Sequence, residues 1–572
     1  MMNSKMKFRP LLTAVSLAVA MGAAQADERE SLETLKQTTL NLIDALVQSG
    51  ALTREKADAL IAEAHRNATQ TSTAQTAGAP EKKDATPDGR PVQRVPYISE
   101  AARAQIRNEI KEEVVSQARL EKWGVPNAPS WTDRIRIDGD FRFRYQAERA
   151  DKGNTDAQTY VNAEVSNNGR ITRAPDFSTS VLNSSSVPIA ANSTTDDRGR
   201  ERIRMRLGVT AKVSDEVGVG VRLATGNATE RVSTNQTLGQ NFNKYQLFVD
   251  RAFVKADPTE WLSIRAGRIP NPWFSTDMIW SENLNFEGVS STASWMSEDR
   301  TWGPFATVGW FPIKESTVGL RGRKTLAGLQ VGSLFQASDR SKFKLGLAYY
   351  RYHNIEGASD PGLADDGAGN IVAVNPNLVG MYEYPSGLRQ KGNTVFETAP
   401  YDSTGRTLPY WGLAYEFAPL ALTASAEFTH FSPYSLMVSA EYVYNTAFDV
   451  GSFRQRAGSA FASVDPGGKR DGYQLRLTFG AADVSEYGDW QVSTTYRHLG
   501  SDAVLDAFND SDMGLGGTNL KGYILGFNFG LSHNTALAAR YLSSKTIDPT
   551  LNSLATSSFG VNVLQVDLNV RF

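Results

Sequence analysis

Arginines spaced two residues apart give the chain its most distinctive chemical pattern. Two segments carry them, and each would place its arginines on one face of an extended strand. Neighbouring strands lie only about 5 Å apart, so charges of one sign repel unless water or carboxylates surround them. We therefore expect a hydrated, polar interior around these residues. The basic positions are Arg134, Arg136, Arg142, Arg144, Arg202, Arg204 and Arg206.

Other residue types that do chemistry are scarce or scattered. The chain has no cysteine, which excludes a disulfide framework, a thiolate metal site and a thiol nucleophile. Its histidines lack metal-ligand spacing such as His-Glu-x-x-His, and no serine marks itself as the partner of a catalytic histidine. They are His65, His353, His430, His498 and His533. The formal net charge of -2 gives no electrostatic reason to bind nucleic acid. We expect no enzyme activity, no cofactor and no metal site.

The elements that must position the arginines are strands, because the polarity alternates with a period of two from residue 134 onwards. Between Ile135 and Tyr145 the odd positions are apolar apart from one glycine, and the even positions are polar or charged. Each alternating run is about ten residues long, which is the length of a tilted strand that crosses a bilayer. Further runs begin near Arg202, Phe343, Leu436, Tyr473, Tyr523 and Leu564.

Two classes of β-protein alternate in this way, the soluble sandwich and the membrane barrel. Sandwich strands are usually shorter, about five or six residues, whereas these runs are long and carry aromatic residues near their ends, as membrane interfaces require. A mean hydropathy of -0.36 fits a barrel, because only alternate residues face lipid. The sequence therefore predicts an all-β transmembrane antiparallel barrel with the arginine ladder in its lumen. The alternative is that the ladder serves lumen packing and lipopolysaccharide contacts at the rim.

The N-terminus carries an export signal. A basic region at 5–9 precedes an apolar run at 11–20, and Ala24-Gln25-Ala26 fits the small-x-small cleavage pattern. The apolar run is too short for an inner-membrane anchor. We expect residues 1–26 to be a signal peptide and the mature chain to begin at Asp27 and reach the bacterial cell outer membrane.

The segment between the signal and the barrel divides into helices and a linker. Residues 27–66 have helical spacing in two halves broken at Ser49-Gly50, which predicts a helical hairpin in the periplasm. Residues 67–96, rich in Thr, Ala, Pro and charge, are expected to be a linker. Residues 97–130 predict either a short trimeric coiled coil or a lone amphipathic helix. The barrel is expected to occupy residues 131–572.

Connection lengths orient the barrel, because bacterial barrels have short periplasmic turns and long outer loops. Counting back from a periplasmic C-terminus makes 500–519 an outer loop, and counting forward makes 147–199 another. The two counts meet only if a further strand lies within 284–299. We expect an even number of strands, about 16 with a range of 14–18, at which size a barrel leaves an aqueous channel. Segment 409–418 belongs either to the next strand or to the long loop 353–420.

Four segments resemble the bacterial family called putative porins, which sits beside the general porins. Residues 46–57 resemble its N-terminal helical hairpin, and Pro96 to Trp131 its helix before the first strand. Residues 267–273 with 285–288 resemble its third-loop signature, and the strand that ends at Phe572 resembles the barrel-assembly signal of the class. The resemblance implies an outer-membrane pore and does not settle a substrate.

The resemblance also implies roles for particular residues. In general porins the third loop folds into the barrel and narrows it, with acids facing a basic wall, and the same transverse field is implied here. The corresponding constriction-loop residues are Arg268, Asn271, Pro272, Asp277, Glu282 and Glu287. The assembly signal falls on Leu564, Val566, Leu568, Val570 and Phe572.

Partners and function follow from the same reading. We expect a homotrimer in contact with the lipid bilayer, lipopolysaccharide and the barrel-assembly machinery, and no nucleic acid. One function is passive diffusion of small hydrophilic solutes or ions, with the N-terminal helices as a periplasmic spacer. The other is a structural or adhesive barrel whose helices bind peptidoglycan. Ion current through planar bilayers discriminates between them.

Overall fold

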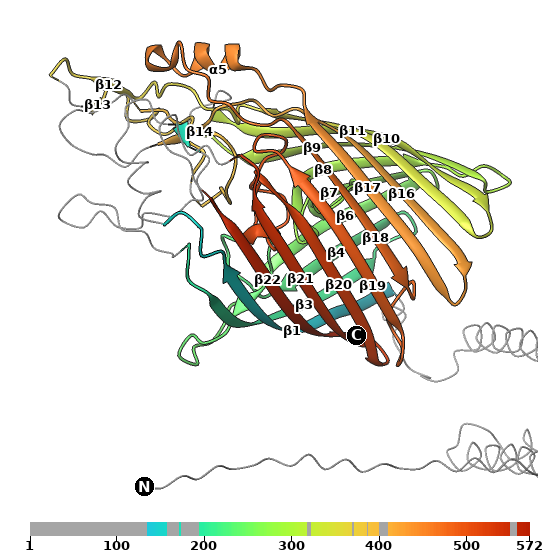
Figure 1. Cartoon of the computed structure of the whole chain (residues 1–572). Helices are drawn as coiled ribbons and strands as arrows, with labels where there is room; N and C mark the ends of the chain where they lie inside the picture. Colours follow the sequence, from blue (N-terminus) through green and yellow to red (C-terminus); the bar gives the residue numbers. More distant parts are fainter. Residues whose placement is uncertain are drawn as a thin grey trace, which may run out of the picture. The chain divides into compact units, whose positions relative to one another are not determined.

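The chain forms a closed antiparallel β-barrel (Figure 1). The computed structural model describes residues 134–156, 171–172, 194–316, 322–368, 371–385, 387–399, 410–548 and 558–572. Within these residues sixteen long strands each pair with the next along the chain, and the last pairs with the first. The predicted antiparallel barrel and its number of strands are therefore confirmed.

The strands of the barrel wall differ in length. They are β1 (Ile135–Ala150), β3 (Arg198–Lys212), β4 (Val217–Ala224), β6 (Phe248–Thr259), β7 (Leu262–Pro270), β8 (Asn285–Ser294), β9 (Trp302–Lys314), β10 (Lys324–Ser338), β11 (Ser341–His353), β16 (Pro419–Phe431), β17 (Tyr434–Asn445), β18 (Asp471–Gly480), β19 (Trp490–Leu499), β20 (Leu520–Ser532), β21 (Thr535–Thr546) and β22 (Gly560–Arg571). Short elements lie in the connections: β2 (Ile171–Thr172), β5 (Gln236–Thr237), β12 (Leu363–Asp365), β13 (Ile371–Ala373), β14 (Val395–Glu397), β15 (Trp411–Leu413), α5 (Val450–Arg456), η3 (Ser459–Phe461) and η4 (Met513–Leu515).

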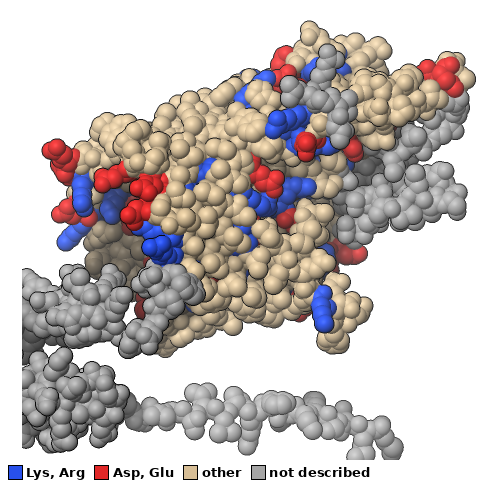
Figure 2. All heavy atoms as spheres, turned by 180° about the vertical axis from the view of Figure 1, so that it is seen from behind, with Lys and Arg blue, Asp and Glu red and all other residues tan. Residues whose placement is uncertain are grey.

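The alternation in β1 divides its side chains between the two sides of the wall. Ile137 and Phe143 on the outer side are 64% and 39% exposed, whereas Arg144 on the inner side is 1% exposed. Because the outer side of a membrane barrel meets lipid, apolar side chains there cost no desolvation. Figure 2 shows one face of the molecule, where broad uncharged areas separate mixed clusters of acidic and basic residues.

The wall closes where β1 meets β22. At the end of this seam the Gly139 N–H donates to the Phe572 carbonyl (2.9 Å), and the Phe572 N–H donates to the Gly139 carbonyl (3.1 Å). A Cβ at Gly139 would lie 2.5 Å from the Phe572 ring. Glycine at this position therefore leaves room for the Phe572 ring at the end of the seam.

Long loops project from one rim and short turns from the other, as the connection lengths predicted. The turns 432–433 and 533–534 contrast with loops that fold over or into the barrel. In bacterial barrels the long loops face the outside and the turns face the periplasm. The loops needed below are L2 (225–247), L3 (271–284), L5 (354–418) and L7 (500–519).

The middle of the barrel has the least regular sequence. The strand required within 284–299 is β8, whose Ser-rich sequence alternates only weakly. Segment 409–418 belongs to L5, because β15 pairs with β14 outside the barrel wall. The wall resumes with β16 at Pro419, and proline is tolerated at the first position of a strand.

The predicted signal peptide (1–26), helical hairpin (27–66), linker (67–96) and helix (97–130) lie outside the described residues. They stay predictions. Among the residues that the structure describes, no helix has the length and apolar character needed to cross a membrane.

Candidate functional site

Loop L3 runs into the barrel interior, where side chains of the wall hold its backbone. Gln330 of β10 brackets Phe274: its Oε1 accepts from the Phe274 N–H (2.8 Å) and its Nε2 donates to the Phe274 carbonyl (2.7 Å). Glu441 of β17 accepts from the Thr276 N–H (3.2 Å) and from the Thr276 hydroxyl. These bonds replace the water that the loop backbone would otherwise need.

An ionic contact fixes the next residue of L3. Asp277 forms an ion pair with Arg497 of β19 (2.8 Å) and a longer one with Arg476 of β18 (3.3 Å). Gln474 donates to the same carboxylate (2.9 Å). Arg497 is 1% exposed, so its charge depends on these partners for compensation.

Loop L7 also turns into the barrel and packs against L3. The Asp510 N–H donates to the Asp277 carbonyl (3.0 Å), and the Ser281 N–H donates to the Phe508 carbonyl (2.8 Å). The two loops therefore form one inward-folded unit.

Two acids on L7 extend the ionic contacts. Asp510 pairs with Arg497 (3.3 Å), while Asp512 pairs with Arg540 of β21 (3.0 Å) and Arg144 of β1 (3.4 Å). The sequence predicted L7 as an outer loop but did not show that it turns inward, so both acids were missed. The only signal was the acidic run Asn509 to Asp512, and one sequence does not tell which of several long loops folds inward.

The side chains of L3, L7 and the wall enclose a middle cavity of about 270 Å³. All of its basic residues come from strands and all of its acidic residues come from the two loops. The basic residues are Arg142, Arg204, Arg476 and Arg540, and the acidic residues are Asp277, Glu282, Asp510 and Asp512. The four basic and four acidic residues balance in number, and two pairs of them are in contact where the loops meet the wall, Asp277 with Arg476 and Asp512 with Arg540.

The four acids differ in the direction in which the protein shifts their pKa. Burial disfavours the charged forms of Asp277 and Asp512, but neighbouring arginines outweigh burial and keep the pKa of each well below its usual range. Glu282 faces the cavity, yet its enclosure in the barrel raises its pKa, and the charge of Asp277 acts in the same sense. Burial also raises the pKa of Asp510, with Asp512 and Asp277 adding to the effect against Arg497.

Two larger cavities adjoin the middle one. The outer cavity, about 860 Å³, lies among the loops and shares Asn235 and Ser511 with the middle cavity. The inner cavity, about 640 Å³, opens at the turn rim and shares Arg204, Gln491 and Asn528 with it. The three cavities follow one another through the barrel along the wall made by β1, β3 and β18 to β22.

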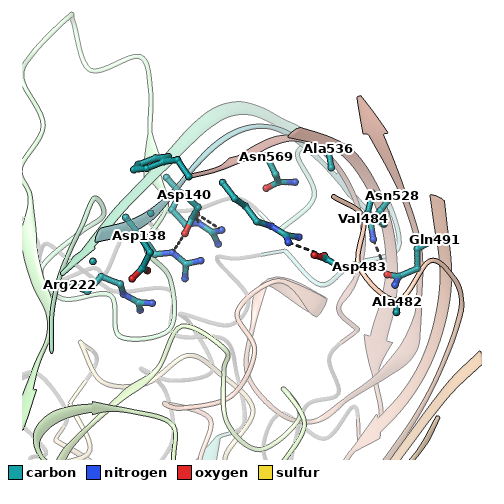
Figure 3. A pocket seen from close by; sticks show the side chains of 16 residues that line it. Asp138, Asp140, Arg222, Ala482, Asp483, Val484, Gln491, Asn528, Ala536 and Asn569 are labelled. Atoms are coloured by element: carbon teal, nitrogen blue, oxygen red, sulfur yellow. Dashed lines mark hydrogen bonds and ion pairs between the residues drawn. The ribbon is translucent and has the colours of Figure 1, made fainter. Parts of the chain in front are cut away.

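Figure 3 gives a close view of the inner cavity. Asp138, Asp140 and Arg222 lie on one side of it, while Asp483, which is bonded to Arg571 (2.9 Å), lies across the opening. Charged and amide side chains thus surround the mouth at the turn rim.

A family model described as "Putative porin" matches residues 36–572. The chain belongs to this family. It is an outer-membrane channel protein, and its family and fold are those of a channel rather than of an enzyme.

Solved structures of outer-membrane porins match the chain at low sequence identity. One is OmpT of Vibrio cholerae in its trimer form, with 9% identity and a TM-score of 0.36 over 77% of this chain and 100% of that one. Others are the channel DcaP of Acinetobacter baumannii, with 10% identity and a TM-score of 0.37 over 77% and 98%, and OprB of Pseudomonas putida, with 11% identity and a TM-score of 0.40 over 77% and 95%. No curated protein matches the chain.

Four of the predicted ladder arginines of this porin line the cavities. Arg142 borders the middle cavity and Arg202 the outer one, while Arg204 borders the middle and inner cavities and Arg206 the inner one. Asp140 on the neighbouring strand compensates two of them, with contacts of 2.7 Å to Arg204 and 2.5 Å to Arg206. The Arg202 Nε is buried without a hydrogen-bond partner in the part of the chain that the structure describes.

The other three ladder arginines lie elsewhere. Arg144 is buried behind the cavities, where Asp567 of β22 holds it through two bonds of 2.7 and 2.8 Å. Arg134 and Arg136 are exposed at the turn rim. The ladder therefore continues beyond the cavity lining at one end.

The residues predicted for the third loop fall into three groups. Asp277 and Glu282 border the middle cavity. Asn271 accepts from the Trp273 N–H (3.0 Å) and so shapes the start of the loop, next to Pro272. Arg268 and Glu287 face each other on β7 and β8 and form an ion pair, away from the middle cavity.

Four of the residues predicted as the assembly signal lie on β22 with their side chains on the outer face, and Phe572 follows directly after the strand. Leu564 and Leu568 are exposed there, and between them Gln565 and Asp567 are buried on the inner face. The Phe572 ring lies against Gly139. This arrangement is the one that the alternation predicted.

No group of three or more His, Cys, Asp or Glu side chains among the described residues could hold a metal ion. His498 of β19 stacks on Tyr473 with ring centroids 5.2 Å apart.

Proposed function

We propose that this porin is a passive diffusion channel for small hydrophilic solutes and ions, narrowed where L3 and L7 face the arginine-bearing wall. The observation that carries the proposal is the series of three polar cavities that share lining residues from the loop rim to the turn rim. A solute on this route would meet side chains that can replace its hydration shell, which is a requirement for permeation.

The arrangement of charge around the middle cavity supports a selective constriction. Its acids belong to the loops and its arginines to the wall, so we infer a field directed between wall and loops, across the route. Such a field orients dipolar solutes and disfavours apolar ones, and it acts strongly because the surrounding protein is a poor dielectric.

Planar-bilayer recording tests the proposal. Purified folded protein should give stepwise ion currents, and swollen liposomes that contain it should admit small neutral sugars faster than large ones. Heat-denatured protein provides the control. Folded, membrane-inserted protein that passes neither ions nor sugars would overturn the proposal and favour the structural or adhesive barrel.

Other features stay predictions. They are the homotrimer, contacts with lipopolysaccharide and the barrel-assembly machinery, and attachment of the N-terminal helices to peptidoglycan. For the assembly signal, support comes from the outward apolar residues of β22 and from the backbone bonds of Phe572 to Gly139.

A further inference from the structure

A side pocket opens from the outer cavity, on the far side of the barrel from the arginine ladder. Its volume is about 530 Å³, within the range of small-molecule sites. L2, L5, L7 and the loop-side ends of β7 to β10 form its walls. It shares Thr229, Glu230, Arg231, Gly387 and Leu388 with the outer cavity, so a solute that enters the barrel from outside can reach it before the middle cavity.

The floor of the side pocket is apolar and well packed. Trp280 of L3 lies edge-on to Phe286 with ring centroids 5.0 Å apart, and Phe286 contacts Phe311 at 4.9 Å. Phe508 of L7 lies 6.2 Å from Trp280, and Leu326 completes the floor. These rings are held in place by one another, so they offer a rigid surface for a hydrocarbon group.

The rim of the same pocket carries cations that lack acidic partners. Lys314 of β9 and Lys324 of β10 are paired at the end of the two strands, beside a register shift, and the charge of Lys314 acts on Lys324. Like charges this close repel each other. Neither lysine forms an ion pair within 4 Å among the described residues, and Lys324, which is 3% exposed, donates only to the Asn354 carbonyl (3.0 Å).

The remaining charges at the rim leave it positive. Arg231 donates to the Gly387 carbonyl (2.7 Å) and forms no ion pair in the described part of the chain. Arg268 is neutralised by Glu287, and Glu230 adds one negative charge to the lining. Glu356 and Glu383 act on Lys324 from beyond ion-pair distance.

We propose that the side pocket binds an amphipathic organic anion, with its hydrocarbon part on the aromatic floor and its carboxylate between Lys314 and Lys324. A bound carboxylate would relieve the repulsion between the two lysines, whereas a neutral or cationic ligand would not. The inference deepens the proposed function, on which it rests for its physiological meaning: the porin would concentrate such anions in its outer vestibule before they pass the middle cavity.

Fluorine NMR of 4-fluorobenzoate tests binding without requiring any current. The probe's signal should shift and broaden with detergent-solubilised protein, while trifluoroacetate, an anion without a ring, and 4-fluorobenzyl alcohol, a ring without a charge, should respond far less. The double variant Lys314→Gln/Lys324→Gln should weaken binding about tenfold or more, because charge-assisted contacts are worth one to two powers of ten in affinity. Lys342→Gln, at an exposed position at the turn end of β11, is the matched control.

The outcomes separate the inference from the proposed function. Equal responses to all three probes, or equal binding by the double variant and the Lys342→Gln control, would overturn the binding site. If 4-fluorobenzoate binds as expected but the protein passes no current, the site stands and the channel proposal fails. In conducting protein, 4-fluorobenzoate added on the loop side should interrupt the current of the wild type and of Lys342→Gln, but not that of the double variant.

Discussion

The two sides of the barrel interior are built in opposite ways. Against β7 to β11, β16 and β17, the inward loops pack an apolar cluster that includes Met278, Trp280, Phe286, Tyr350 and Phe508. We call this the filled side. Against β1, β3 and β18 to β22, the same loops present carboxylates to arginines and leave the middle cavity open. We call this the charged side.

The contrast shows how one loop can both reduce the volume of the lumen and set the shape of the space that remains. Asp277 and Met278 are neighbours in L3, yet Asp277 pairs with arginines of the charged side while Met278 is fully buried in the apolar cluster. Apolar packing is non-directional and fills space, so it removes volume from the lumen. Ion pairs hold atoms at set distances but keep a hydrated space beside them, so they shape what remains.

The largest effect is expected from Asp277→Ala. The substitution leaves the buried Arg497 without its closest carboxylate, and breaking a buried ion pair costs about 3–5 kcal/mol. L3 should detach from the charged side, and single-channel recording should detect a larger and noisier conductance. A conductance trace identical to that of the wild type would show that this ion pair does not set the width of the route.

Met278→Ala is the matched change on the filled side. Removing a buried methionine side chain costs about 2–5 kcal/mol through lost packing, so thermal unfolding should begin at a lower temperature. The balance of charge around the middle cavity is unchanged, and the ion selectivity should stay that of the wild type. A changed reversal potential in this variant would contradict the division into two sides.

A smaller effect is expected from Arg142→Ala/Arg204→Ala. Both arginines border the middle cavity, and their loss leaves its acids in excess. The reversal potential in a salt gradient should move towards cation selectivity by about two- to fivefold in permeability ratio, since a unit charge 4 Å away in water is worth about 1 kcal/mol. Arg134→Ala/Arg136→Ala, at the exposed end of the same ladder, should change selectivity much less. Equal shifts in the two variants would remove Arg142 and Arg204 from the constriction.

The sequence was informative where a local pattern has one physical meaning. The alternation in β1 and β22 placed their residues on the correct faces, because a period of two admits no other arrangement in a strand. Counting the alternating turns and loops from both ends located β8, although its Ser-rich sequence hardly alternates. The two counts agree only if the number of strands is even, because both ends of the barrel lie on one rim.

The sequence could not predict the partners across the lumen. Ion pairs such as Arg144 with Asp512 and Arg497 with Asp277 join a wall strand to an inward loop far along the chain, and no spacing rule links them. The inward course of L7 depends on packing against L3 and on bonds such as those of Asn393 to the Ser501 and Val504 carbonyls. Long loops of similar polarity give no local sign of such contacts, so Asp510 and Asp512 were missed.

The smallest effect is expected from pH, because only two of the four acids around the middle cavity have a raised pKa. The pKa of Glu282 and that of Asp510 are raised, whereas those of Asp277 and Asp512 are held low. As the pH falls, Glu282 and Asp510 take up protons first, the lining becomes more positive, and anion permeability should rise at a pH above the usual carboxyl range. Each lost charge should change the permeability ratio by less than about twofold, since Glu282 faces water that screens it.

In Glu282→Gln the ratio should already be shifted at neutral pH and should respond less to acid, while Glu287→Gln, outside the middle cavity, keeps the full response. An equal pH response in both variants would mean that the charged side does not titrate through Glu282.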